Sequence, residues 1–260
     1  MEILKFTLSG KNACFRKPER NAYGYFTYGN IHKIALLGLF GAILGYRGYS
    51  QIRDFMKKGR KSPGLVQSYP EFYDRLKEVK VSILPSENFP KGFIPKKIQT
   101  FNNSVGYASQ EQGGNLIVKE QWLENPCWDI CVLIDSEEAE KIKKAICSRS
   151  CVYYPYLGKN DHPADIKNVI VEPAITQKFH MGRINCLGPK EEIFFADLDE
   201  DDLEDLDAFG SFKYEEALPI ALDGWTNHYI LKDFLYTDEF VEVKGIPVYG
   251  LSDGRKIVFY

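Results

Sequence analysis

The chain has 260 residues with 44% hydrophobic side chains, which is enough to bury a core as one large or two small domains. Its net charge of −3 conceals a gradient, because residues 1–61 carry 12 Lys and Arg against 3 Asp and Glu, whereas residues 191–260 carry 5 against 18. The apolar run between Lys33 and Arg47 is too short for a membrane span and starts too deep in the chain for a signal peptide. These features exclude a membrane protein and predict that a polyanion binds the basic part while a different partner meets the acidic part.

The first expected elements are a strand at residues 2–8 and a basic loop at residues 9–21, which holds Lys11, Arg16, Lys17 and Arg20. The uncharged run at residues 34–46 then predicts a buried helix, and one side of it within about an 80° arc carries Gly38, Gly41, Gly45 and Gly48. Glycine is costly inside a helix, so the groove that it leaves must be used, either by a closely packed sheet or by the backbone of a ligand. Neither a G-x-G-x-x-G fingerprint nor a Walker A loop accompanies these glycines.

The start of this helix predicts an anion site. Asn30 is a good N-cap, which places His32 and Lys33 in the first turn. A cation opposes the helix dipole there, unless a phosphate sits on the free N–H groups beside Lys33. The alternative is a solvated lysine next to a locally hydrogen-bonded histidine.

The remaining chain predicts a second helix, a strand, a long arm, two further strands joined by a tight turn, and a third helix capped by Ser136. In that order they occupy residues 67–79, 79–84, 85–114, 115–123, 127–134 and 136–149. A turn-rich stretch at residues 152–166 precedes six short β-like runs, at residues 168–175, 192–196, 227–235, 239–243, 246–250 and 256–260.

Two possible metal sites are weak. Cys127, Cys131, Cys147 and Cys151 have a zinc-like spacing, but the first pair lies in a β-like run that would hold its sulfurs too far apart, so reduced thiols are the better account. The acidic run from Asp197 lacks the glycine and glutamate that a calcium loop requires at its sixth and twelfth positions. We therefore expect no metal and no cofactor.

The order strand–helix–strand–strand–helix–strand predicts an α+β fold with a ferredoxin-like (RRM-like) N-terminal domain at residues 1–155. Residues 85–114 form its inserted β-hairpin arm, and residues 156–260 form a β-rich C-terminal region.

Four segments, taken in order, resemble the CRISPR-associated "Cas five" family, especially its type I-B branch. They are ACFRKP, NIHKIALLGLFGAILGY, the expected hairpin VKEQWLENPCWDICVLI, and YLGKNDHPADI, and the match spans roughly residues 2–175. The resemblance implies a non-catalytic, cytoplasmic subunit of Cascade that grips the 5′ handle of the CRISPR guide RNA (crRNA) and meets target DNA only indirectly. It also implies contacts with the backbone subunit and the large subunit, with the arm kinking the guide near the first backbone subunit.

Carried over to this chain, the resemblance implies a set of RNA contacts in the basic loop, the helix start and the arm. These residues are Lys11, Arg16, Lys17, Arg20, Tyr23, Tyr25, Tyr28, Asn30, His32, Lys33, Lys96, Lys97, Asn102 and Asn103. The tyrosines are interleaved with cations and could stack on splayed bases, although ordinary sheet packing explains them equally well.

Two other classes of function stay open. One branch of the family cleaves precursor crRNA without a metal, and His162 or His180 could serve such a reaction, although neither has an obvious partner in the sequence. A purely structural protein that self-assembles through its glycine helix is the other class, but packing alone does not require the basic N-terminal part.

Overall fold

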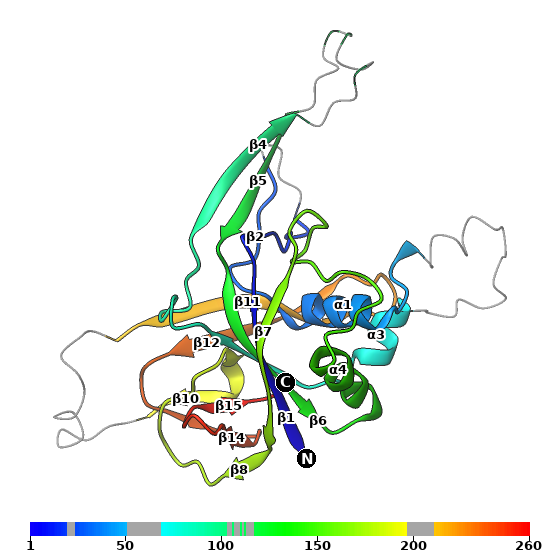
Figure 1. Ribbon diagram of the computed structural model, residues 1–260. Coiled ribbons are helices and arrows are strands. Elements are labelled where there is room, and N and C mark those ends of the chain that lie inside the picture. The colour runs from blue at the N-terminus through cyan, green and yellow to red at the C-terminus, as the bar shows by residue number, and fades with distance from the viewer. Residues whose placement is uncertain are drawn as a thin grey trace.

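The computed structural model describes residues 1–19, 24–50, 69–102, 106, 110, 112, 117–196 and 211–260. The fold is α+β, with helices gathered on one side of a central sheet and most C-terminal strands on the other (Figure 1). In chain order the elements are β1 (Glu2–Ser9), β2 (Asn12–Ala13), α1 (Lys33–Leu44), α3 (Glu71–Leu76), β3 (Val81–Pro85), β4 (Lys96–Asn102), β5 (Ile117–Glu124), β6 (Cys127–Ile134), α4 (Glu137–Cys147), β7 (Asp165–Pro173), β8 (Ile175–Gln177), β9 (Gly188–Pro189), η2 (Lys190–Glu192), β10 (Ile193–Phe195), β11 (Lys213–Leu222), β12 (Tyr229–Thr237), β13 (Val241–Val243), β14 (Val248–Gly250) and β15 (Lys256–Val258). None of the helices in these ranges is long and apolar enough to cross a membrane.

The central sheet has the strand order β3-β6-β1-β7, and each neighbouring pair is antiparallel. α1 and α3 connect β1 to β3, and α4 connects β6 to β7. β7 completes this sheet by pairing with β1, although it lies beyond residue 155, where we expected the N-terminal domain to end.

Each face of the central sheet contributes to a buried core, and β1 supplies side chains to both. Leu4, Phe6 and Leu8 belong to the core that faces the helices. Ile3 belongs to a second core, made with the C-terminal strands on the opposite face. Successive side chains of a strand point to opposite faces, so one strand supplies both cores.

α1 begins two residues later than predicted. The N-cap is His32, whose side chain accepts a hydrogen bond from Ala35 N at 3.2 Å, and not Asn30. Asn30 is fully buried because its amide has partners elsewhere: Trp128 Nε1 donates to its Oδ1 at 2.8 Å, and its Nδ2 donates to Gly92 O at 3.0 Å. Asn30 therefore ties the entry of α1 to β6 and to the chain that leads into β4.

The glycines of α1 have different uses. A Cβ at Gly41 would lie 2.5 Å from Phe72 Cβ, so this glycine allows α3, and not a sheet as we expected, to pack against the helix. Among the described residues, a Cβ at Gly38 would meet only Phe72 Cε2, at 4.0 Å, so no close contact there requires a glycine. Gly45 caps the helix in the left-handed conformation, with φ of 78°.

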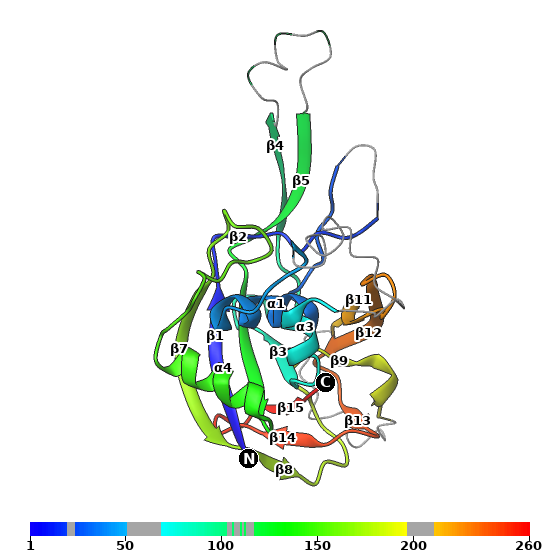
Figure 2. The ribbon, with the colours of Figure 1, turned by 90° about the vertical axis from the view of Figure 1, so that its right-hand side faces the viewer.

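The arm projects well away from the body, but its second strand differs from the prediction (Figures 1 and 2). β4 pairs with β5 in register from Lys96–Leu123 to Asn102–Ile117, whereas we expected β5 to pair with β6 as a core hairpin. β6 instead pairs with β1 and β3. The chain turns between the two sheets at Asn125, whose φ of 45° is left-handed, and at Pro126, which cannot donate to a ladder.

The C-terminal region contains one long strand that the sequence pattern did not predict. β11 carries Glu215, Glu216 and Pro219, which do not look like a strand in isolation, yet it pairs with β12 over its whole length. A register shift follows Pro219 and accommodates the proline. The second predicted helix is also shorter than expected, because α3 starts after Pro70 and ends at Leu76; residues 67 and 68 lie outside the described residues.

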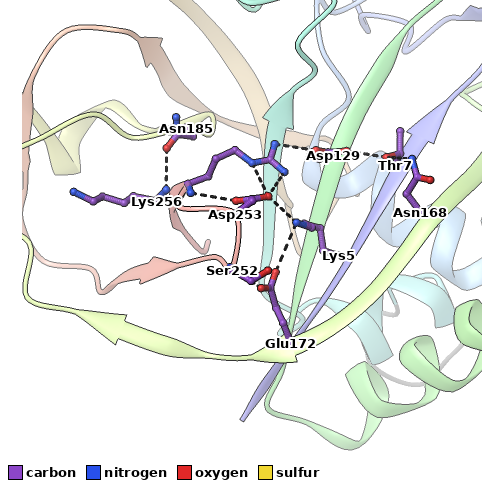
Figure 3. Close-up of polar contacts among 10 residues, drawn as sticks. Lys5, Thr7, Asp129, Asn168, Glu172, Asn185, Ser252, Asp253 and Lys256 are labelled. Atoms are coloured by element: carbon purple, nitrogen blue, oxygen red, sulfur yellow. Dashed lines mark hydrogen bonds and ion pairs between the residues drawn. The ribbon is translucent and has the colours of Figure 1, made fainter.

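A polar network attaches the C-terminal strands to the central sheet (Figure 3). Lys5 of β1 is 8% exposed, and its Nζ donates to Asp253 Oδ2 at 2.7 Å and lies 3.8 Å from Glu172 Oε1. Arg255 contacts Asp253 and also Asp129 of β6, each at 2.8 Å. The ion pairs of this network thus link the turn between β14 and β15 to three strands of the central sheet, β1, β6 and β7.

Replacing Asp253 with Asn should lower the free energy of unfolding at pH 7 by about 1–2 kcal/mol, because a buried lysine loses its main partner. Burial alone would raise the pKa of Asp253, but hydrogen bonds from Arg255 and Lys5 hold it well below its ordinary value. The stabilisation is therefore complete above about pH 4 and is lost as the pH falls further.

Urea unfolding of the Asp253→Asn variant and of the unchanged protein between pH 7 and pH 2.5 measures this difference, which should become smaller as the pH falls below about 4. Asp233→Asn, at an exposed carboxylate of β12, is the control and should change the free energy of unfolding by less than about 0.5 kcal/mol. A difference between Asp253→Asn and the unchanged protein that stays constant across the pH range would contradict the assignment.

Candidate nucleic-acid interface

The basic loop lies against the base of the arm (Figure 2). Tyr25 N donates to Lys119 O at 2.9 Å, and Gln121 N donates to Tyr25 O at 2.8 Å, so the loop extends the arm sheet along the free edge of β5. The guanidinium of Arg16 lies 3.3 Å from the centre of the Tyr25 ring, which fixes an exposed cation on an aromatic face. Arg16 and Tyr25, which belong to the stretch where cations and tyrosines alternate in the sequence, thus form a stacked pair at the arm base.

One face of the arm is open and basic. Cross-strand partners share a face, and on this face the exposed residues of β4 and β5 are Lys96, Ile98, Thr100, Asn102, Ile117 and Lys119. We call this set the open face of the arm. Lys119 was missed by the sequence prediction, because β5 was expected to be a core strand; the alternation of its charged and apolar residues is the signal that could have found it.

The opposite face of the arm leans on the loop between α4 and β7. Lys159 Nζ lies 2.6 Å from Glu120 Oε2 and 5.2 Å from the centre of the Phe101 ring. His162 packs edge-on against Trp122, with ring centres 4.5 Å apart. These contacts orient the arm relative to the body.

Two of the lysines that were predicted to contact RNA already lie near carboxylates of the protein. Lys17 is half-buried, with Nζ 3.8 Å from Glu216 Oε1, and Lys97 Nζ lies 3.3 Å from Glu124 Oε1. Lys11, Lys96 and Asn102 are exposed at the base and along the arm. Arg20, Tyr23 and Asn103 lie outside the described residues.

Four predicted contacts are buried in this structure. Tyr28, Asn30, His32 and Lys33 are 1%, 0%, 2% and 9% exposed. Burial lowers the pKa of Lys33 to about 8, with the charge of Glu78 acting in the opposite direction. Lys33 therefore lies beside Glu78, below the surface, and not in the groove described next.

A groove of about 750 Å³ runs beside α1. Its floor includes the small residues Ala35, Gly38, Ala42 and Gly45 of α1. Its other described lining residues are Cys14, Phe15, Arg16, His32, Ile34, Leu39, Tyr46, Arg47, Gly48, Tyr49, Ser50, Phe72, Tyr153, Tyr156, Gly158 and Tyr229. The five tyrosines come from three separate parts of the chain, so the sequence pattern alone could not have assembled them.

The described histidines and cysteines form no nucleophile–base pair. His162 is 2% exposed, burial lowers its pKa, and neither ring nitrogen has a hydrogen-bond partner among the described residues. Burial raises the pKa of the Cys14 thiol to about 11. No group of His, Cys, Asp and Glu within the described ranges is arranged to hold a metal ion.

No protein-family model matches the sequence, and no curated protein matches it. A chain of a CRISPR RNA-guided surveillance complex has a similar structure, with a TM-score of 0.50 and 13% identity over 91% of this chain and 90% of its own length. A CRISPR protein from Archaeoglobus fulgidus aligns with a TM-score of 0.48 and 11% identity, over 100% of this chain and 98% of that one. A chain of the type III-B Cmr-beta complex bound to cognate target RNA and AMPPnP aligns with a TM-score of 0.47 and 10% identity, over 93% and 86%.

The similarity to the chain of the CRISPR RNA-guided surveillance complex supports the assignment of the fold. The resemblance to CRISPR-associated proteins that the sequence suggested is confirmed at the level of the fold.

Proposed function

We propose that this chain is a non-catalytic subunit of a type I CRISPR surveillance complex and binds the 5′ handle of the crRNA. The complex forms around the guide, with this chain at its 5′ end and in contact with the backbone and large subunits. Its N-terminal part acts as a ferredoxin-like module, a proposal supported by the β–α–β–β–α–β order and by the strand order β3-β6-β1-β7.

The observation that carries this proposal is the basic, aromatic surface at the base of the arm. Lys11, Arg16, Lys96 and Lys119 are all exposed and lie on β4, on β5 or on the loop beside them. Phosphate groups bind such cations irrespective of sequence. Unpaired bases can stack on exposed aromatic rings nearby.

The metal-independent nuclease has no comparable support. General acid–base catalysis needs a titratable group within hydrogen-bond reach of the reacting atoms. His162 is instead enclosed by Trp122 and the loop that carries it. We therefore propose a binding role without cleavage.

Replacing both Lys96 and Lys119 with Ala should weaken binding of single-stranded RNA irrespective of its sequence. Each lost phosphate contact lowers the slope of log K against log salt by about 0.7, so the slope should fall by about 1.4. Fluorescence anisotropy across a salt series, with a labelled crRNA handle, measures this slope.

Lys167→Ala is the matched control, because Lys167 is an exposed lysine of β7 that pairs with Asp165. Its slope should equal that of the unchanged protein. An unchanged slope in the Lys96/Lys119 double variant would show that the open face of the arm does not contact RNA.

Shortening the arm should impair assembly without harming the fold. Phe101 and Val118 are a cross-strand pair, so an Asn-Gly turn can replace residues 102–117 and keep the base contacts of Glu120 and Trp122. The melting temperature should stay within about 2 °C, because none of the described residues that are removed belongs to either core. Co-purification with crRNA and the backbone subunit should drop sharply; complete assembly would refute a role for the arm, and a collapse in melting temperature would show that its outer part belongs to the core.

A further inference from the structure

We propose that the groove beside α1 binds unpaired nucleobases of single-stranded RNA by stacking. This inference rests on the proposed function and adds to it a second contact region, separate from the open face of the arm. The groove would bind the flat face of a nucleobase, while the cations at the base of the arm would bind phosphate groups.

The floor of the groove provides room for a planar group. Ala35, Gly38 and Ala42 are half-buried, whereas the larger apolar residues of α1 are buried in the core. Within the described ranges, an added Cβ at Gly38 would meet only Phe72 Cε2, at 4.0 Å. A glycine is costly inside a helix, and close approach of a ligand accounts for its presence at this position.

The walls of the groove are aromatic and held in place. Tyr153 is 62% exposed, yet its backbone N donates to Ala42 O at 3.1 Å, and Val152 N donates to Ile43 O at 2.9 Å. These bonds satisfy carbonyls at the end of α1 and anchor the loop that carries Tyr153. Tyr49 is 48% exposed and is positioned by an edge contact with Phe72, with ring centres 5.9 Å apart. Exposed rings on a fixed backbone are the usual platform for stacked bases.

Charge favours a polyanion as the occupant. Two arginines, Arg16 and Arg47, are among the described lining residues, and no Asp or Glu is. His32 also lines the groove, and burial lowers its pKa to about 3, so the ring is neutral. Its Nδ1 accepts from Ala35 N, which leaves Nε2–H as the ring donor, and no partner for it is recorded in the described part of the chain. An apolar peptide would leave Arg47 and this donor unused.

The test compares two labelled probes of equal charge, decauridylate and a ten-residue abasic ribose-phosphate chain, by fluorescence anisotropy at one salt concentration. The unchanged protein should bind decauridylate at least about tenfold more tightly, because stacking requires a base. Gly38→Leu fills the floor and should reduce the ratio of the two dissociation constants several-fold. Tyr153→Leu keeps the apolar bulk but removes the aromatic face, and should reduce the ratio several-fold.

Tyr154→Leu is the matched control, because Tyr154 is 89% exposed, adjacent in sequence and absent from the groove lining. It should keep the full ratio. If Gly38→Leu lowers the melting temperature, Tyr153→Leu decides alone. Two results would overturn the groove proposal and leave the proposed function standing. One is that the unchanged protein binds both probes with a ratio of dissociation constants near one. The other is that Tyr153→Leu leaves this ratio unaffected. No binding of either probe by the unchanged protein overturns both.

Discussion

The fold depends on one constraint: α1 is apolar on nearly every side, so nearly every side must be covered. Lys33 is its only charged residue, and even that side chain is buried. A helix of this kind is stable only inside a core, and the chain surrounds it with the central sheet, α3, α4 and β11. Ala35, Gly38 and Ala42 of this helix are only half-buried among the described residues, and they form the floor of the groove.

The same constraint links the helix to the surfaces that we assign to RNA. At its start, Asn30 joins Trp128 in the sheet to Gly92 on the way to the arm, so the position of the helix and the root of the arm are set together. At its end, the backbone of Tyr153 is held by the last carbonyls. Binding surfaces built on buried elements in this way are pre-organised, which lowers the entropy that binding must overcome.

The sequence was sufficient where the signal was local. The Ser136 cap of α4 is confirmed, with Ala139 N donating to Ser136 Oγ at 3.2 Å, and the strand at β1 follows from its apolar run. The sequence prediction was wrong where residues far apart in the chain determine the structure. Asn30 is predicted as an N-cap from the local sequence, but in the structure its amide bonds to Trp128 and Gly92. The residues of β5 are predicted as a core strand, but in the structure they pair with β4 in the arm. The groove could not be found from sequence, because Tyr49, Tyr153 and Tyr229 meet only in the fold.

Photo-crosslinking of a 4-thiouridine-labelled crRNA in the assembled complex, mapped by mass spectrometry, tests the account most directly. The account predicts crosslinks in two clusters, one on β4, β5 and the loop around Arg16, and one on the segments that carry Tyr49 and Tyr153. Crosslinks confined to the strands of the C-terminal region, with none at the arm base or the groove, would contradict it.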